Sequence, residues 1–167
     1  PISTFARGAI IDPFALQKDG KIIIGGTFTA TASATSSGGA SVSAYRKSVR
    51  IPALLKTYNN IARLNSDGSI DSSFYSDGTD NDVFAIAIQS DDKIIIGGDF
   101  TKYNMTDCKH IMRLNADGSP DTFSTGTGFD NSVDAITIQD DGKMLVGGNF
   151  TSFNGTSRGH VARLNSD

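Results

Sequence analysis

The chain has 167 residues, of which 38% are hydrophobic and 20% are charged. It is therefore long enough to bury a core, and its composition is that of a globular protein rather than a disordered one. The formal net charge of -3 argues against nucleic acid and anionic membranes as partners. Cys108 is the single cysteine, and every apolar run is far shorter than the roughly 20 residues that span a bilayer, so we expect no internal disulfide, no cysteine-based zinc site and no membrane insertion.

The first predicted element is a strand that opens each of three similar units, at Ile11–Gln17, Val83–Gln89 and Val133–Gln139. In the second copy, VFAIAIQ, smaller residues alternate with larger ones, so both faces of the strand are apolar. A strand of this kind is buried on both sides. The sequences KDG, SDD and DDG follow and predict a tight hairpin turn, because Asp and Gly adopt the backbone angles that such turns require.

A second predicted strand follows each turn and carries the clearest repeat of the chain. It reads KIIIGGTFT from Lys21, KIIIGGDFT from Lys93 and KMLVGGNFT from Lys143. The apolar residues before the glycines predict a buried strand, and the glycine pair indicates a bulge or a close approach of backbone at its end. We therefore assign structural roles to six glycines: Gly25, Gly26, Gly97, Gly98, Gly147 and Gly148.

A third predicted strand places an arginine at the same register in every unit. The strands are Ile61–Asn65, Ile111–Asn115 and Val161–Asn165. An arginine held in a packed strand needs an acceptor, and we expect a carboxylate or a backbone carbonyl of the same or the next unit. Binding of an anion is the alternative. The arginines are spaced 50 residues apart, at Arg63, Arg113 and Arg163.

A turn and a short fourth strand, near Asp71–Phe74 and Asp121–Phe123, complete the pattern. The turn reads Asn-x-Asp-Gly-Ser-x-Asp, in which alternating oxygen side chains resemble a short calcium loop. The later Glu of such a loop is missing, and a plain turn accounts for the same residues. We expect no metal centre and no cofactor. The alternative is calcium at Asn65, Asp67, Asp71, Asn115, Asp117 and Asp121.

The repeat length predicts an all-β fold of three four-stranded antiparallel propeller blades. A unit of about 50 residues has the size of one blade, and no apolar stripe at helical spacing is available to cover a sheet. The predicted blades are residues 1–69, 70–119 and 120–167, the last ending within its final turn. Propellers close with about four to eight blades, so we expect the remaining blades of a longer chain, or copies of this one, as partners.

Only the first unit carries an insertion, which we place at residues 30–58. Its first part is rich in Ala, Ser, Thr and Gly and predicts a flexible loop. The following stretch, YRKSVRIPALLK, is basic and partly apolar. An insertion confined to one repeat often carries contacts, so Arg46, Lys47 and Arg50 are candidate partner contacts. A tolerated insertion that covers a core edge is the alternative.

The segment VFAIAIQSDDKIIIGGDFTKYN followed by HIMRLNADGSPDTF closely resembles the delta-60 repeat, a propeller-forming family of bacterial surface and secreted proteins and of some phage proteins. The resemblance covers nearly all of the chain except residues 30–58. The chain departs from the pattern at Asp92, which stands in place of Gly, and at Pro13. The glycine pair is also similar to that of kelch blades, but the later aromatic positions of kelch are missing. The resemblance implies a scaffold and an extracellular, cell-surface or virion location; it implies no activity.

The sequence favours a structural or interaction module over an enzyme. Asp residues recur in the turn of every unit, whereas catalytic groups occur once, and no Gly-x-Ser-x-Gly, phosphate-loop or HExxH motif is present. We expect the module to mediate protein–protein contacts or adhesion, with other assembly proteins or surface glycans as partners. Binding of a glycan or another ligand by loops near the propeller axis is the alternative.

Overall fold

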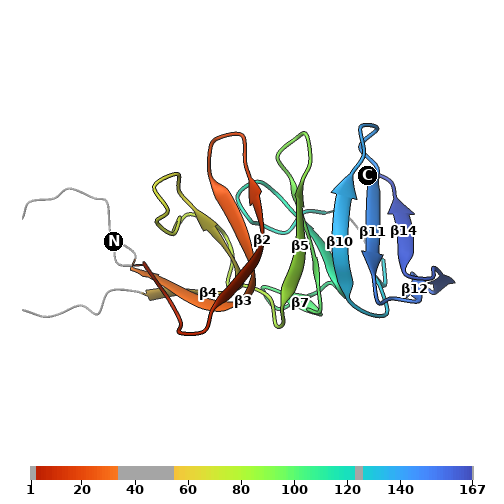
Figure 1. Ribbon diagram of the computed structural model, residues 1–167, viewed down its shortest axis with the longest axis horizontal. Coiled ribbons are helices and arrows are strands. Elements are labelled where there is room, and N and C mark those ends of the chain that lie inside the picture. The colour runs from red at the N-terminus through yellow and green to blue at the C-terminus, as the bar shows by residue number, and fades with distance from the viewer. Residues whose placement is uncertain (1–2, 34–54, 123–125, 167) are drawn as a thin grey trace, which may run out of the picture.

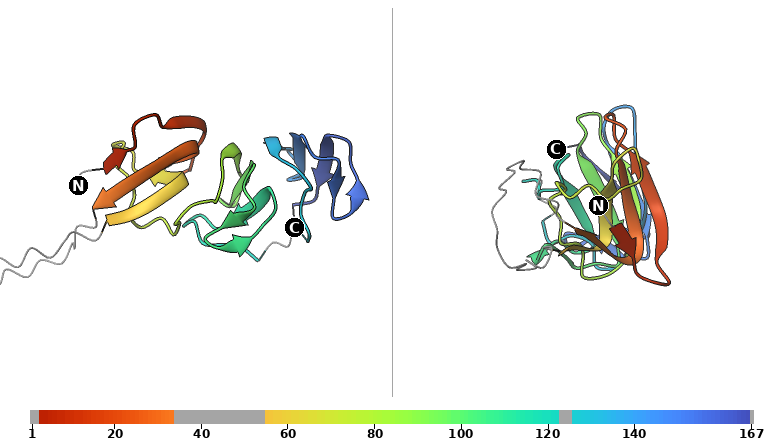
Figure 2. Two further views of the ribbon diagram at one scale, coloured as in Figure 1. Left: turned by 90° about the horizontal axis from the view of Figure 1, so that it is seen from below. Right: turned by 90° about the vertical axis from the view of Figure 1, so that its left-hand side faces the viewer.

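The computed structural model describes residues 3–33, 55–122 and 126–166, and every regular element in these segments is a β-strand. The three larger sheets follow one another along the longest axis of the molecule (Figure 1 and Figure 2). Within the described segments, no helix is long and apolar enough to cross a membrane. The strands are β1 (Ser3–Phe5), β2 (Ile10–Leu16), β3 (Ile22–Ser33), β4 (Leu55–Leu64), β5 (Val83–Ile88), β6 (Ile94–Gly98), β7 (Lys102–Tyr103), β8 (Thr106–Asp107), β9 (Ile111–Leu114), β10 (Val133–Ile138), β11 (Met144–Gly148), β12 (Ser152–Phe153), β13 (Thr156–Ser157) and β14 (Val161–Leu164).

Each larger sheet is one blade, built from strands that are consecutive or nearly so in the chain. The antiparallel orders are β2-β3-β4, β5-β6-β9 and β10-β11-β14. β1 pairs with β3 beyond the end of β2. The opening strands β2, β5 and β10 lie side by side, with β5 packed between the other two (Figure 1). The predicted all-β architecture of successive blades is therefore confirmed.

The fourth strand of each blade is smaller than the sequence indicates. Residues 71–74 and 121–122 form no strand, Phe123 lies outside the described residues, and the structure instead has single bridges, Leu64 with Ile70 and Leu114 with Pro120. Pro120 has no N–H to continue a ladder. The chain makes one more backbone bond, from Asp71 N to Arg63 O in the first blade, before it turns away. The second and third blades are thus three-stranded sheets, the first has β1 as an additional strand, and a single bridge forms a short fourth edge in the first two.

The insertion in the first blade begins and ends as an extension of the hairpin, which differs from the loop predicted over residues 30–58. Ala30 pairs with Tyr58 and Ala32 with Lys56, so β3 and β4 are longer than their counterparts. Ala30 and Tyr58 are completely buried, which explains why these small and aromatic residues extend the sheet. The candidate contacts Arg46, Lys47 and Arg50 lie outside the described residues.

The core consists of two apolar clusters, one on each side of the middle blade. Ile94 and Ile96 belong to the cluster shared with the first blade, whereas Ile95 belongs to the cluster shared with the third. All three side chains are almost completely buried. The continuous apolar run before the glycines therefore reflects a strand covered on both faces by neighbouring sheets.

In the first two blades, the first glycine of the pair lies against the next blade. A Cβ atom on Gly25 would lie 2.7 Å from Val83 Cγ1, and one on Gly97 would lie 2.5 Å from Val133 Cγ1. Real Cβ atoms do not approach other atoms so closely, so only glycine allows the sheets to reach this separation. Gly147 has the same register in the last blade, but its Cβ would meet only the carbonyl oxygen of His160, at 3.8 Å.

The second glycine of each pair is required by the backbone of its own blade. A Cβ on Gly98 would collide with the carbonyl oxygen of Asp82, and one on Gly148 with that of Ser132. The register shifts at this point between Val83 and Ala85, so the bulge lies in the strand opposite the glycines. The two glycines of a pair thus serve two different contacts.

Replacement of Gly97 by alanine tests the contact between blades. The new methyl group overlaps Val133 and also approaches Ile136 Cδ1 to 2.9 Å. We expect Gly97→Ala to lower the free energy of unfolding by about 1–3 kcal/mol, the usual cost of overpacking a core. Urea unfolding measures this loss of stability, and we expect the m-value to stay unchanged.

Gly159→Ala is the matched control, because nothing lies within 4 Å of a Cβ at that position. We expect its stability to stay within about 0.5 kcal/mol of the unmodified chain. Equal stabilities for Gly97→Ala and Gly159→Ala would contradict the packing described here.

Candidate functional site at the blade junctions

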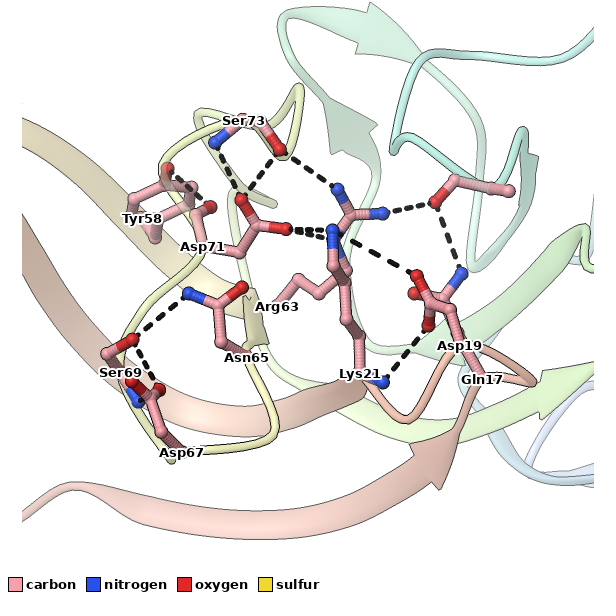
Figure 3. Close-up of polar contacts among 11 residues, drawn as sticks. Gln17, Asp19, Lys21, Tyr58, Arg63, Asn65, Asp67, Ser69, Asp71 and Ser73 are labelled. Atoms are coloured by element: carbon pink, nitrogen blue, oxygen red, sulfur yellow. Dashed lines mark hydrogen bonds and ion pairs between the residues drawn. The ribbon is translucent and has the colours of Figure 1, made fainter. Parts of the chain in front are cut away.

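A buried arginine connects the first two blades at the edge of their apolar cluster (Figure 3). Arg63, on β4, donates from Nε to Asp71 Oδ2 at 2.9 Å and from Nη1 to the carbonyl oxygen of Ala116 at 2.7 Å. Asp71 belongs to the same blade, whereas Ala116 is in a turn of the next blade. Lys21 Nζ lies 2.8 Å from the same carboxylate oxygen of Asp71. The acceptors expected from the sequence, a carboxylate and a carbonyl, are both present.

The second junction repeats this arrangement 50 residues later. Arg113 donates from Nε to Asp121 Oδ2 at 2.5 Å and from Nη1 to the carbonyl oxygen of Ser166 at 2.6 Å. Lys93 Nζ lies 3.4 Å from Asp121 Oδ2. Arg63 and Arg113 are 6% and 9% exposed, whereas Arg163, at the same register in the last blade, is exposed. Burial of this arginine therefore requires a following blade.

Both carboxylates at these junctions stay ionised to unusually low pH. Burial would raise the pKa of Asp71, but hydrogen bonds from Lys21 and Ser73 together with the charge of Arg63 outweigh it and hold the pKa well below its ordinary value. The pKa of Asp121 is also lowered, since the hydrogen bond and charge of Arg113 outweigh its burial. Each junction thus contains a paired, charge-assisted network.

The turns considered for calcium use their oxygens in separate ways. Asp67 Oδ1 accepts from Ser69 N at 2.9 Å and from Ser69 Oγ at 2.6 Å, and these bonds lower the pKa of Asp67. Asn65 donates to Ser69 Oγ, whereas Asp71 faces Arg63 (Figure 3). Asp117 repeats the turn of Asp67, and Asn115 that of Asn65. In the described part of the chain, no three His, Cys, Asp or Glu residues are grouped as metal ligands.

Sequence reasoning missed a second repeated carboxylate. Asp80 accepts from Thr101 N and Lys102 N, both at 2.8 Å, and from Thr101 Oγ1 at 2.7 Å. Asp130 makes the same three bonds to Thr151 and Ser152. Hydrogen bonds from Thr151 and Ser152 hold the pKa of Asp130 well below its ordinary value. The signal in the sequence was an Asp-Asn pair that recurs after 50 residues.

The departure from the repeat at Asp92 creates an additional contact between the first two blades. Asp92 occupies a turn position with φ of 66°, where glycine is the usual residue. Its carboxylate lies 3.7 Å from Lys18 Nζ, and Lys18 also donates to the carbonyl oxygen of Ser90. This ion pair joins the hairpin turns of two neighbouring blades.

Open cavities lie beside the hairpin turns at both junctions. The first has a volume of about 250 Å³ and contains both signs of charge, from Arg63 and Lys18 and from Asp19 and Asp117. The second has a volume of about 610 Å³, and its lining includes Asp91, Asp140 and Asp141. At the end where the hairpin turns lie, the junctions are therefore open and polar, although their interiors are apolar.

The family of the chain follows from its repeated segments. Residues 17–39, 56–74, 89–123 and 139–167, more than half of the chain, match the family described as a domain of unknown function (DUF5122) beta-propeller. The chain belongs to this β-propeller family. The DUF5122 match omits residues 40–55, within the insertion that only the first unit carries, and it includes the glycine pair and the arginine of every unit. No curated protein matches the sequence.

Replacement of Arg113 by leucine tests whether the buried arginine stabilises the junction between the second and third blades of this DUF5122 protein. The substitution removes the arginine from the largely buried carboxylate of Asp121, which keeps Lys93 and the N–H of Thr122 as partners, and it removes the bond to Ser166. We expect the free energy of unfolding to fall by about 3 kcal/mol, as when one partner of a buried ion pair is removed. Thermal unfolding measures the loss. Arg158→Leu, at an exposed site, should melt like the unmodified chain, and equal melting of both variants would refute the role of Arg113.

The lowered carboxylate pKa values predict loss of stability in acid. Because the folded-state pKa of Asp71 lies below its unfolded value of about 4, its contribution is present above that pH and is lost as pH falls through the folded-state pKa. At pH 7, we expect Asp71→Asn to have a lower free energy of unfolding than the unmodified chain. Below about pH 4, we expect the free energy of unfolding of Asp71→Asn to fall less than that of the unmodified chain. Urea titrations at each pH measure both effects. Parallel pH profiles for Asp71→Asn and the exposed control Asp107→Asn would contradict this linkage.

Proposed function

We propose that this chain is a non-enzymatic structural and interaction module that mediates protein–protein contacts or adhesion. The repeated side chains that could have formed a reactive site are engaged in holding the blades. Each recurring carboxylate in the described part of the chain accepts a hydrogen bond from its own turn or from a strand or loop of its own blade, and this observation carries the proposal. These residues are Asp19, Asp67, Asp71, Asp80, Asp91, Asp117, Asp121, Asp130 and Asp141.

The single thiol also supports a non-catalytic role. Cys108 is 5% exposed, and burial raises the pKa of its thiol to about 12. A thiol at that pKa is almost entirely protonated at neutral pH and is a poor nucleophile. Cys108 therefore acts as a small apolar residue of the core.

The location that we propose rests on the resemblance to delta-60 repeats. Within the DUF5122 propeller family, the motifs Gln-x-Asp-Gly-Lys, Gly-Gly-x-Phe and Arg-Leu-Asn-x-Asp-Gly-Ser support membership of that finer group. We propose accordingly that the module works in an extracellular, cell-surface or virion assembly, with other assembly proteins as its partners.

Glycan binding is the second candidate, and the larger cavity favours it. Gln89 and Gln139 line this cavity together with Asp91 and Asp141. The side-chain oxygens of the two glutamines are buried and have no hydrogen-bond partner among the described residues. The exposed carboxylates of Asp91 and Asp141 can accept hydrogen bonds from sugar hydroxyls, and the two glutamines border the same cavity.

A glycan array separates the two candidates. We expect no saturable binding of the chain to any immobilised glycan, because the carboxylates of Asp91 and Asp141 in the larger cavity already accept hydrogen bonds from their own turns. Binding that is lost in Gln139→Leu but kept in the exposed control Asp107→Asn would overturn the purely structural proposal and assign the larger cavity to a sugar.

A further inference from the structure

The two internal junctions use one and the same contact. Val83 and Ile86 of β5 face Gly25 of the first blade, and their counterparts Val133 and Ile136 of β10 face Gly97 of the second. In each case the opening strand supplies apolar side chains and the preceding blade supplies the space above a glycine. A junction therefore has a donor face and an acceptor face, which belong to different blades.

The third blade has an acceptor face that no described residue covers. Leu145 is 39% and Val161 64% exposed, although the residues at the same registers of the middle blade, Ile95 and Ile111, are buried. Gly147 lies between them, in a shallow hollow of about 220 Å³. This acceptor face, formed by Leu145, Gly147, Val161 and Arg163, has the pattern that the next blade covers at both internal junctions.

The first blade has the matching donor face, which is also uncovered. Ile11 pairs with Gly26 and Phe14 with Ile24, just as Val83 pairs with Gly98 and Ile86 with Ile96. The donor face is formed by Ile11, Phe14 and Leu16, which are 43%, 73% and 67% exposed. A contiguous apolar face of this kind is rare on an isolated soluble protein and marks an interaction surface.

We propose that the donor face of one chain packs on the acceptor face of a second copy, head to tail. The proposal rests on the structural role proposed above and deepens it by naming the partner and the surface. In this contact Ile11 and Phe14 occupy the space above Gly147, as Val83 and Ile86 do above Gly25. Two copies supply six blades, which lies within the four to eight of closed propellers.

The polar part of the junction is complementary in the same way. Arg63 and Arg113 each donate to a carbonyl oxygen located 53 residues later, in the turn of the following blade. Arg163 is exposed and has the same register. In the head-to-tail contact its acceptor is the carbonyl oxygen of Ser66 in the second copy, which is the residue equivalent to Ala116 and Ser166.

A second copy suits both faces, because each copy carries both halves of the contact. Two acceptor faces lack the contact of the internal junctions, in which side chains of an opening strand lie above the glycine of the preceding blade. The contact is therefore heterologous, so it forms a ring if the rotation closes and a filament if it does not.

Sedimentation velocity over a range of protein concentrations tests the proposal. We expect the chain to associate, and we expect Phe14→Asp and Gly147→Val each to raise the dissociation constant about 30-fold or more, as for central interface residues. Phe14 is exposed, and a Cβ atom at position 147 would meet only the carbonyl oxygen of His160, at 3.8 Å, so both variants should fold, which urea unfolding at low concentration checks. Tyr75→Asp, at an exposed aromatic residue outside both faces, should associate like the unmodified chain.

An equimolar mixture of Phe14→Asp and Gly147→Val decides whether the contact is heterologous. The first variant keeps an intact acceptor face and the second an intact donor face, so the mixture should form a 1:1 complex although neither variant associates alone. A monomeric unmodified chain, association that survives either substitution, or a mixture that stays monomeric would each overturn the proposal. These outcomes are independent of the glycan array, so a failure here leaves the structural function itself standing.

Discussion

The structure depends on the close approach of sheets that are apolar on both faces. A strand such as Ile94–Gly98 would expose isoleucine side chains to water on one side if only one neighbour covered it. Burial of a single isoleucine stabilises a protein by about 1.5–3 kcal/mol, so a blade gains most of its stability from two neighbours. The missing side chains at Gly25 and Gly97 allow the next sheet to come close enough for this packing. The stability of the blades is therefore a property of the junctions between them.

The arginine network gives each junction a direction and a register. Apolar contacts between sheets tolerate small sliding motions, whereas the guanidinium of Arg63 must meet both Asp71 and the carbonyl oxygen of Ala116. Removal of these charges from water is costly, and the ion pair with its additional hydrogen bonds compensates that cost only in the correct geometry. The apolar cluster thus supplies the attraction between blades, and the network determines how they are aligned.

The sequence was sufficient to predict the class of fold, the principal strands and the need of each arginine for an acceptor, because these follow from short-range periodicity and from chemistry. It did not reveal which carbonyl accepts from Arg63, since Ala116 is 53 residues away and only the packing of blades brings it close. The extended hairpin was missed because the stretch was interpreted from its Ala, Ser, Thr and Gly content, although Phe28, Ala30 and Ala32 alternate with threonines and are all buried in the strand. Asp80 was overlooked because the recurring Asp-Asn pair does not show that its carboxylate accepts hydrogen bonds from Thr101 and Lys102, which lie 21 and 22 residues later in the chain.

The ion pair between Lys18 and Asp92 makes the three repeats distinguishable from one another. At the second junction the equivalent positions are Ser90 and Gly142, which cannot form it. Chains with nearly identical repeats risk pairing the wrong units during folding, either within one molecule or between two. A charge pair that only the first and second blades can make favours the correct neighbour, although a partly exposed pair contributes no more than about 1 kcal/mol. The order of the blades is therefore part of the information in the sequence, and exchange of two blades by recombination would yield a chain with the same motifs but a less selective first junction.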